Sequence, residues 1–142
     1  MKKEEHIYKE VNAAGQCGLL KGNEDARQLA NMFFTPKGLE FCTKNNVPTL
    51  KSLSQYSSEE IIKYDFYVNA PVKAKNLKRV ALIGSGTVAE LEYTETEGYP
   101  VVLMHGAKAK ITASGYSVVI LTNAGGEVEI IKNDFATILY DR

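Results

Sequence analysis

The sequence predicts an α+β chain in which a small helical unit, residues 1–64, precedes a short β-solenoid, residues 65–142. Three observations support this fold class. Short capped helical segments give way to alternating β segments near residue 65. The β segments recur with a period just below twenty residues, and corners of small residues separate them. An antiparallel β-sandwich is the alternative, although hairpins have no reason to keep a constant period.

The first unit is expected to contain four short helices. Residues 1–11 form a charged segment in which Ile7, Tyr8 and Val11 can share one face. The sequence places the helix starts at N-cap residues or a proline near the first position: Asn23, Thr35-Pro36, Pro48-Thr49, and Ser57 with Glu60 as a capping box. Asn45-Asn46 is expected to end the second helix, and residues 61–64 complete the fourth.

The second unit consists of runs rich in Val, Ile, Leu and Thr. The expected strands are residues 80–83, 87–93, 101–104, 108–113, 117–121, 127–131 and 135–140. Several of these runs alternate polar and apolar residues, which is typical of a sheet with one buried and one solvated face.

The period of the repeat predicts stacked coils with two strands each. We align Leu82, Leu103, Ile120 and Ile138, which lie 21, 17 and 18 residues apart. In a second column we align Val88, Ala109 and Val128, which lie 21 and 19 residues apart. A polar insert at residues 94–98 explains the longer first spacing. The corners are expected at residues 84–86, 105–107 and 122–126, because coils of a solenoid turn at small residues.

The segment Gly84-Ser85-Gly86-Thr87-Val88-Ala89 has the spacing of a dinucleotide-binding turn. That motif requires a helix directly after the glycines, whose N-terminus holds the pyrophosphate. Residues 87–97 are instead rich in threonine and alternating acids, and Pro100 follows soon after. We therefore interpret Gly84 and Gly86 as a tight corner that needs a positive φ.

Composition narrows the classes of partner. Lys+Arg and Asp+Glu both number 17, so the chain lacks the basic excess of a general nucleic-acid binder, and we expect no nucleic-acid partner. A neutral chain repels itself weakly, which favours self-association. No apolar run is long enough to span a membrane, and residues 1–11 do not resemble a signal peptide. Cys17 and Cys42 are expected to be buried free thiols, and the protein is expected to be cytoplasmic.

No catalytic, cofactor-binding or metal-binding residue is assigned, and no cofactor is expected. His6 is expected to be solvated in a frayed segment, and His105 to occupy a corner without a useful partner. Glu90, Glu92, Glu95 and Glu97 fit the solvated face of a strand followed by a loop. The basic run of residues 72–79, with Lys73, Lys75, Lys78 and Arg79, fits a solvated linker or a sheet edge protected from pairing, and an acidic partner is the alternative.

The layout resembles that of an uncharacterised group of small proteins from gut bacteria and their prophages. The residues that carry the resemblance are a Cys-Gly-Leu-Leu segment, then FFTPKGLEFCTKNNVPTL, VALIGSGTVAELEY and SGYSVVILTNAGGEVEII. Members pair a helical N-terminal region with β repeats of the N-A-x-V-x-A kind, and this chain departs from them at AKAKITA and GGEVEII. The resemblance implies the fold and a mobile-element context, and it implies no activity or site residues.

We expect a non-enzymatic structural or interaction protein, encoded by a prophage. The last coil, residues 135–140, has no evident cap, so we expect homo-oligomerisation through it, and a protein partner is also compatible. A carbohydrate- or small-ligand-binding module, with Tyr99 and Tyr116 on the solenoid face, is the first alternative. An enzyme with a site near His105 is the second.

Overall fold

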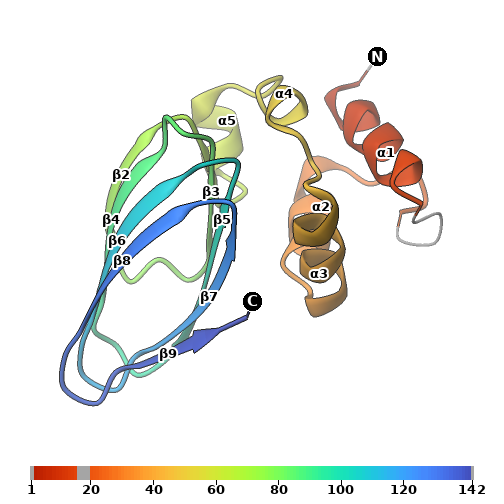
Figure 1. The fold of residues 1–142 in the computed structure, drawn as a ribbon. Coiled ribbons are helices and arrows are strands. Elements are labelled where there is room, and N and C mark those ends of the chain that lie inside the picture. Colours follow the sequence, from red (N-terminus) through yellow and green to blue (C-terminus); the bar gives the residue numbers. More distant parts are fainter. Residues whose placement is uncertain (1, 16–19, 142) are drawn as a thin grey trace. The chain divides into compact units, whose positions relative to one another are not determined.

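The chain is α+β, and it divides into two compact units at Tyr64 and Asp65 (Figure 1). The computed structural model describes residues 2–15 and 20–141. The helical unit contains α1 (Lys3–Ala13), α2 (Ala26–Phe33), α3 (Pro36–Asn45), α4 (Leu50–Leu53) and α5 (Ser58–Ile62). None of these helices is both long and apolar enough to cross a membrane.

Local sequence signals set most of the helix ends. The side-chain oxygens of Thr35, Thr49 and Ser57 accept hydrogen bonds from backbone N–H groups three residues on, as predicted for N-caps. Asn46 ends α3 in the left-handed conformation. The prediction of Asn23 as the first cap was wrong. Asp25 caps α2, because Asp25 and Gln28 each accept a 2.8 Å hydrogen bond from the other's backbone N–H.

The expected charged segment at the N-terminus is a fifth helix, α1, with Ile7 and Val11 buried. Its Glu10 carboxylate reaches the start of α4. There it accepts hydrogen bonds from the Thr49 backbone N–H (3.0 Å), from the Ser52 hydroxyl (2.7 Å) and from the Thr49 hydroxyl. A carboxylate at a helix N-terminus satisfies donors that the helix leaves unpaired. This long-range contact explains why a weakly patterned segment is helical.

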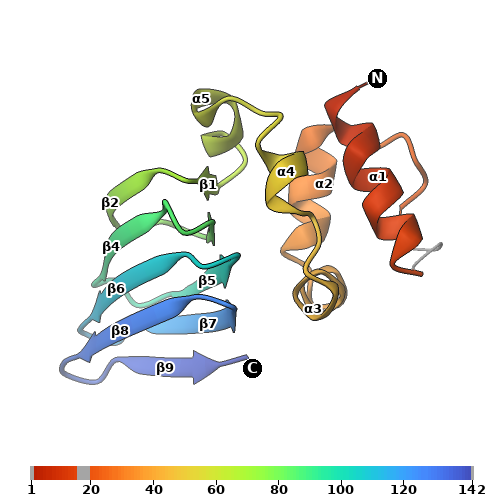
Figure 2. The same ribbon diagram turned by 45° about the horizontal axis from the view of Figure 1, so that its top comes forward.

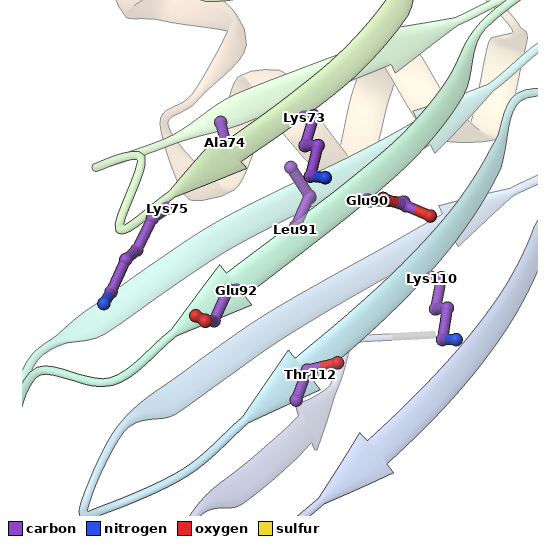
Figure 3. Close-up of a pocket in the computed structure, with 8 residues that line it drawn as sticks. All are labelled: Lys73, Ala74, Lys75, Glu90, Leu91, Glu92, Lys110 and Thr112. Atoms are coloured by element: carbon purple, nitrogen blue, oxygen red, sulfur yellow. The ribbon is translucent and has the colours of Figure 1, made fainter.

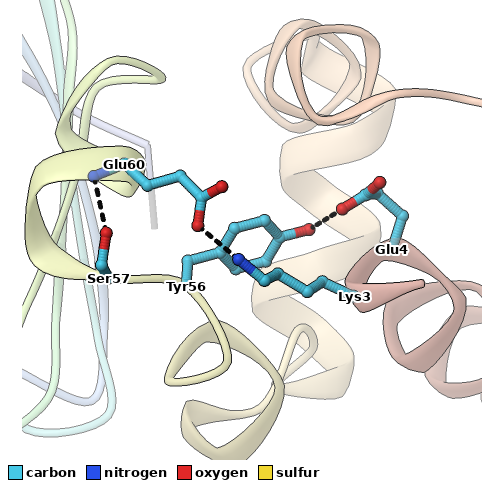
Figure 4. A network of polar contacts seen from close by, with 5 residues as sticks. All are labelled: Lys3, Glu4, Tyr56, Ser57 and Glu60. Carbon is cyan, nitrogen blue, oxygen red and sulfur yellow. Dashed lines mark hydrogen bonds and ion pairs between the residues drawn. The ribbon is translucent and has the colours of Figure 1, made fainter. Parts of the chain in front are cut away.

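A second set of polar contacts joins α1 to the α4–α5 region (Figure 4). Lys3 pairs with Glu60 at 2.6 Å and lies 5.4 Å from the centre of the Tyr56 ring. The Tyr56 hydroxyl donates to Glu4 at 2.6 Å. Burial and the neighbouring Glu4 carboxylate raise the pKa of Tyr56, so its hydroxyl stays a donor. The hydrogen bond to Lys3 lowers the pKa of Glu60.

The second unit is a β-solenoid of about four coils (Figure 2). Its strands are β1 (Phe66–Val68), β2 (Pro71–Lys75), β3 (Val80–Ile83), β4 (Val88–Tyr93), β5 (Gly98–Met104), β6 (Lys108–Ala113), β7 (Val118–Ala124), β8 (Glu127–Lys132) and β9 (Thr137–Tyr140). Odd-numbered strands form one parallel sheet in the order β1-β3-β5-β7-β9, and even-numbered strands form the other in the order β2-β4-β6-β8. Each coil therefore contributes one strand to each sheet.

The register corrects part of the predicted alignment. Leu82 pairs with Leu103 as expected, but Leu103 pairs with Asn123 and not with Ile120. Ile138 pairs with Val119. In the other sheet, Ala89 and not Val88 is aligned with Ala109 and Val128. The predicted insert at residues 94–98 was also wrong, because four residues link β4 to β5 and four also link β6 to β7.

The corners rely on asparagine and aspartate as much as on glycine. Asn69, Asn76 and Asp134 have φ between 49° and 55°, and each accepts a hydrogen bond from the backbone N–H of a corner residue in the neighbouring coil. Asn and Asp tolerate this left-handed conformation better than other non-glycine residues. The predicted corner at residues 122–126 is shorter than expected, because β7 extends to Ala124.

The core lies between the two sheets and includes a tyrosine pair. The Tyr93 and Tyr99 rings, whose centroids are 4.5 Å apart, are almost fully buried. Among the described residues, neither hydroxyl has a hydrogen-bond partner. Burial raises the pKa of both phenols. An unpaired buried hydroxyl costs free energy in the folded state.

We therefore expect Tyr93→Phe and Tyr99→Phe each to raise the free energy of unfolding by about 1 kcal/mol. Urea denaturation followed by circular dichroism measures the change. Tyr116→Phe is the control, since Tyr116 is 61% exposed and should show no change. A loss of stability in either core variant would mean that its hydroxyl is hydrogen-bonded.

Candidate functional site: the charged face and the terminal coil

The glycine motif lies in a corner between two strands. Gly84 has a φ of 91°, as predicted, and it directly follows β3. Gly86 does not have a positive φ. Its N–H donates to Asn69 Oδ1 at 3.0 Å, and a Cβ added there would lie 3.0–3.3 Å from Asn69 atoms. Residues 88–93 form β4 and not a helix, so the backbone that a pyrophosphate needs is not built here.

The two histidines and Cys42 lie in different elements of the chain. His6 is half-buried within α1, so the prediction of a frayed and solvated side chain was wrong. His105 occupies the corner between β5 and β6 with a φ of 57°. Cys42 is buried in α3, and burial raises the pKa of its thiol to about 12, so it is a poor nucleophile near neutral pH. Cys17 lies outside the described residues. The described residues contain no group of three or more His, Cys, Asp or Glu side chains placed to share a metal ion.

The basic run lies partly on a sheet edge and partly in a loop, since residues 72–75 belong to the edge strand β2 and residues 76–79 link β2 to β3. Lys73 and Lys75 lie on β2, the first strand of the even-numbered sheet. Arg79 follows β2 and forms a 2.9 Å ion pair with Asp65. The predicted acidic row divides in the same way, since Glu90 and Glu92 lie on β4 and Glu95 and Glu97 lie in the loop after it.

Together these strands form a face on which charge alternates from strand to strand, which we call the charged face. One row reads Lys73, Glu90, Lys110 and Glu129 across β2, β4, β6 and β8. Beside it, Lys75 is aligned with Glu92, and Lys108 is aligned with Glu127. Figure 3 shows Lys73, Glu90 and Lys110 in line across their strands. Opposite charges on adjacent strands contribute about 0.2–1 kcal/mol a pair, so the alternation also specifies the register.

Two depressions lie on this face. The first is lined by Lys73, Ala74, Lys75, Glu90, Leu91, Glu92, Lys110 and Thr112 (Figure 3). The second continues toward the last strand, where Glu127, Val128 and Glu129 line it. Sequence reasoning treated the lysines and glutamates as separate features. These lysines and glutamates occupy alternate positions of their strands, so they share one face of the sheet once the register is known. That alternation is the sequence signal that could have grouped them.

The last coil exposes apolar and aromatic side chains, and we call this surface the terminal coil. Its exposed members are Phe135 (70%), Tyr140 (66%), Leu139 (50%) and Ile131 (38%). The Phe135 ring stacks on that of Tyr116 at 5.0 Å, with an interplanar angle of 9°. Tyr99, which we expected on the surface, is instead 1% exposed and belongs to the core.

The inward residues of the terminal coil are also incompletely covered. In the even-numbered sheet, Leu91 and Ile111 are almost fully buried, whereas Ile130 in the next strand is only partly buried. In the odd-numbered sheet, Tyr99 and Val119 are buried and Ile138 is partly buried. Burial thus falls at the last coil, because within the described part of the chain no further coil packs against it.

Comparison with known proteins adds no relative, since no family model, curated protein sequence or solved structure matches the chain. The geometry therefore supplies the argument for function. The β-solenoid presents two surfaces suited to binding, the charged face and the terminal coil.

Proposed function

We propose that the protein is a non-enzymatic structural or interaction protein, encoded by a prophage, that self-associates through the terminal coil. The observation that carries the proposal is the group of exposed side chains Phe135, Leu139 and Tyr140 on the last coil that the structure describes. The prophage context rests on the sequence resemblance alone.

A symmetric dimer is the simplest assembly that covers this surface. The backbone N–H groups of Thr137 and Asp141 donate to the carbonyls of Ser117 and Leu121. The alternation of a strand therefore turns the N–H groups of Ile138 and Tyr140 toward the free edge of β9. β9 itself carries no charged side chain. Two copies of β9 can therefore pair without opposing like charges, and they remove apolar surface from water as they do so.

Light scattering across a concentration series tests the proposal. We expect a dimer that dissociates on dilution, and we expect Leu139→Lys to weaken association about tenfold or more, because it places a charge in the interface. Val88→Lys is the matched control, since Val88 is 56% exposed and lies on β4, away from the terminal coil. Deleting residues 133–142 should also abolish the dimer. A mass that is monomeric at every concentration would contradict self-association.

Ligand binding on the solenoid face is the second candidate. The depression between Lys73, Glu90 and Lys110 favours it, because it presents both charges to a polar ligand. A monomeric mass in the scattering experiment would place this candidate first. A carbohydrate and small-ligand screen would then follow, with Tyr116→Ala replacing the buried Tyr99 as the aromatic variant.

A further inference from the structure

The free edge of β8 lies in the even-numbered sheet, whereas β9 ends the odd-numbered sheet. β8 is the last strand of the order β2-β4-β6-β8, and among the described strands it pairs with β6 alone. The Glu127 N–H donates to the Ala107 carbonyl at 2.9 Å, so the odd-numbered residues of β8 bond to β6. Because backbone groups alternate along a strand, the N–H and C=O groups of Val128 and Ile130 point to the free edge.

The side chains of β8 define what can pair there. On the outer face, the row Lys73, Glu90, Lys110 and Glu129 changes sign at each step from β2 to β8. In the row beside it, Lys108 on β6 is followed by Glu127 on β8. On the inner side, Val128 and Ile130 are partly buried and would be covered by one more strand. A strand that continues both patterns is basic opposite Glu127 and Glu129 and apolar opposite Val128 and Ile130. Lys132 lies at the end of β8, beyond these four positions.

We propose that the free edge of β8 binds an extended segment of another protein in which basic and apolar residues alternate, added as a parallel fifth strand of the even-numbered sheet. Strand addition of this kind combines main-chain hydrogen bonds with side-chain selection at alternate positions. The charge of Glu127 and Glu129 supplies the selection.

A second copy of this chain fits the edge less well. Antiparallel pairing of two β8 strands about Glu129 sets like charges opposite each other, which is destabilising. The copy's β2 has the required pattern in Val72, Lys73, Ala74 and Lys75. However, β1 and β2 belong to one coil, so a β2 strand added to β8 would bring the copy's β1 next to β7 in the odd-numbered sheet. β9 already occupies that position. The fitting partner is therefore a separate protein segment.

The probe is a labelled peptide with the sequence of β6, Lys-Ala-Lys-Ile-Thr-Ala, because β6 already pairs with β8 on its other side. Fluorescence polarisation with the full chain measures its binding against a charge-reversed peptide, Glu-Ala-Glu-Ile-Thr-Ala. We expect the basic peptide to bind about tenfold more tightly at low salt, or about 1.4 kcal/mol. The double variant Glu127→Lys, Glu129→Lys should invert this preference. Glu95→Lys, Glu97→Lys makes the same change of charge in the loop after β4, and it should leave the preference unchanged.

Two N-methylated peptides separate strand addition from simple charge attraction. In a parallel fifth strand, the N–H groups of the two lysines face β8 and that of the isoleucine faces away. Methylation of the second lysine's N–H should therefore abolish binding, whereas methylation of the isoleucine's N–H should be tolerated.

Several results would overturn the proposal. Equal binding of the two methylated peptides would show charge attraction alone, and equal binding of the basic and charge-reversed peptides would remove the selection by Glu127 and Glu129. Failure of every peptide to bind at millimolar concentration would also refute it. A change in the protein's own mass on Glu127→Lys, Glu129→Lys would assign the edge to a second copy. Since Leu139→Lys tests β9 and these variants test β8, the two proposals can fail separately.

Discussion

Replacement of Leu103 by alanine should lower the free energy of unfolding of the β-solenoid by about 3 kcal/mol. Leu103 is completely buried on β5, within a core cluster to which both sheets contribute. Its neighbours on either side in the sheet, Leu82 and Asn123, belong to coils held by continuous backbone ladders. The surrounding structure cannot collapse into the space left by the side chain, so the cost includes a cavity as well as lost burial.

Urea denaturation followed by circular dichroism measures this loss. Val88→Ala, on the neighbouring coil, is the control, and because Val88 is exposed it should change stability by less than about 0.5 kcal/mol. Equal effects of the two substitutions would contradict the assignment of Leu103 to the centre of the core.

Gly38→Ala should lower the free energy of unfolding of the helical unit by about 3 kcal/mol or more. The same substitution inside an unobstructed helix usually raises stability by about 1 kcal/mol. Gly38 is buried in the first turn of α3, where the chain returns directly after α2. A Cβ there would lie 1.9 Å from the Met32 carbonyl oxygen and 2.9 Å from Thr35 Oγ1. Because the Met32 contact is with backbone, relief requires α2 and α3 to move apart.

The helical unit can be followed through Cys42, which is buried in α3. In a Cys17→Ser background, Gly38→Ala should speed the reaction of Cys42 with a thiol reagent and lower the urea midpoint. Lys37→Ala, at the exposed neighbouring position, is the control and should leave both unchanged. An unchanged or raised midpoint for Gly38→Ala would show that the two helices separate at little cost.

Features that depend on neighbouring residues were predictable from the sequence. The caps at Thr35, Thr49 and Ser57 follow from hydrogen bonds that span three residues, and the strands follow from alternation over a few positions. Helix caps and strand alternation each depend on residues within a few positions of one another, so a single sequence is enough to predict them. The helix α1 was missed because its stabilising contacts join Glu10 to Thr49 and Ser52, about forty residues away.

The register shows the same limit. A shift of one residue turns each side chain to the opposite face, and Val88 and Ala89 are equally plausible partners for Ala109 when only spacing is considered. Backbone pairing selects Ala89, which is buried, and leaves Val88 exposed. Tyr99 was misplaced for a similar reason, since tyrosine suits both a surface and a half-buried strand.

The amino-acid sequence alone predicts the boundary between the helical and β regions and the two-strand coil, because both depend on local pattern and on the period of the repeat. Tertiary structure decides which charges become neighbours. Lys73, Glu90, Lys110 and Glu129 are spread over 57 residues and form one row only when four coils stack in a single register. It also decides that β8 and β9 are the last strands of their two sheets among the described residues, and that β8 presents Glu127 and Glu129 whereas β9 presents apolar side chains.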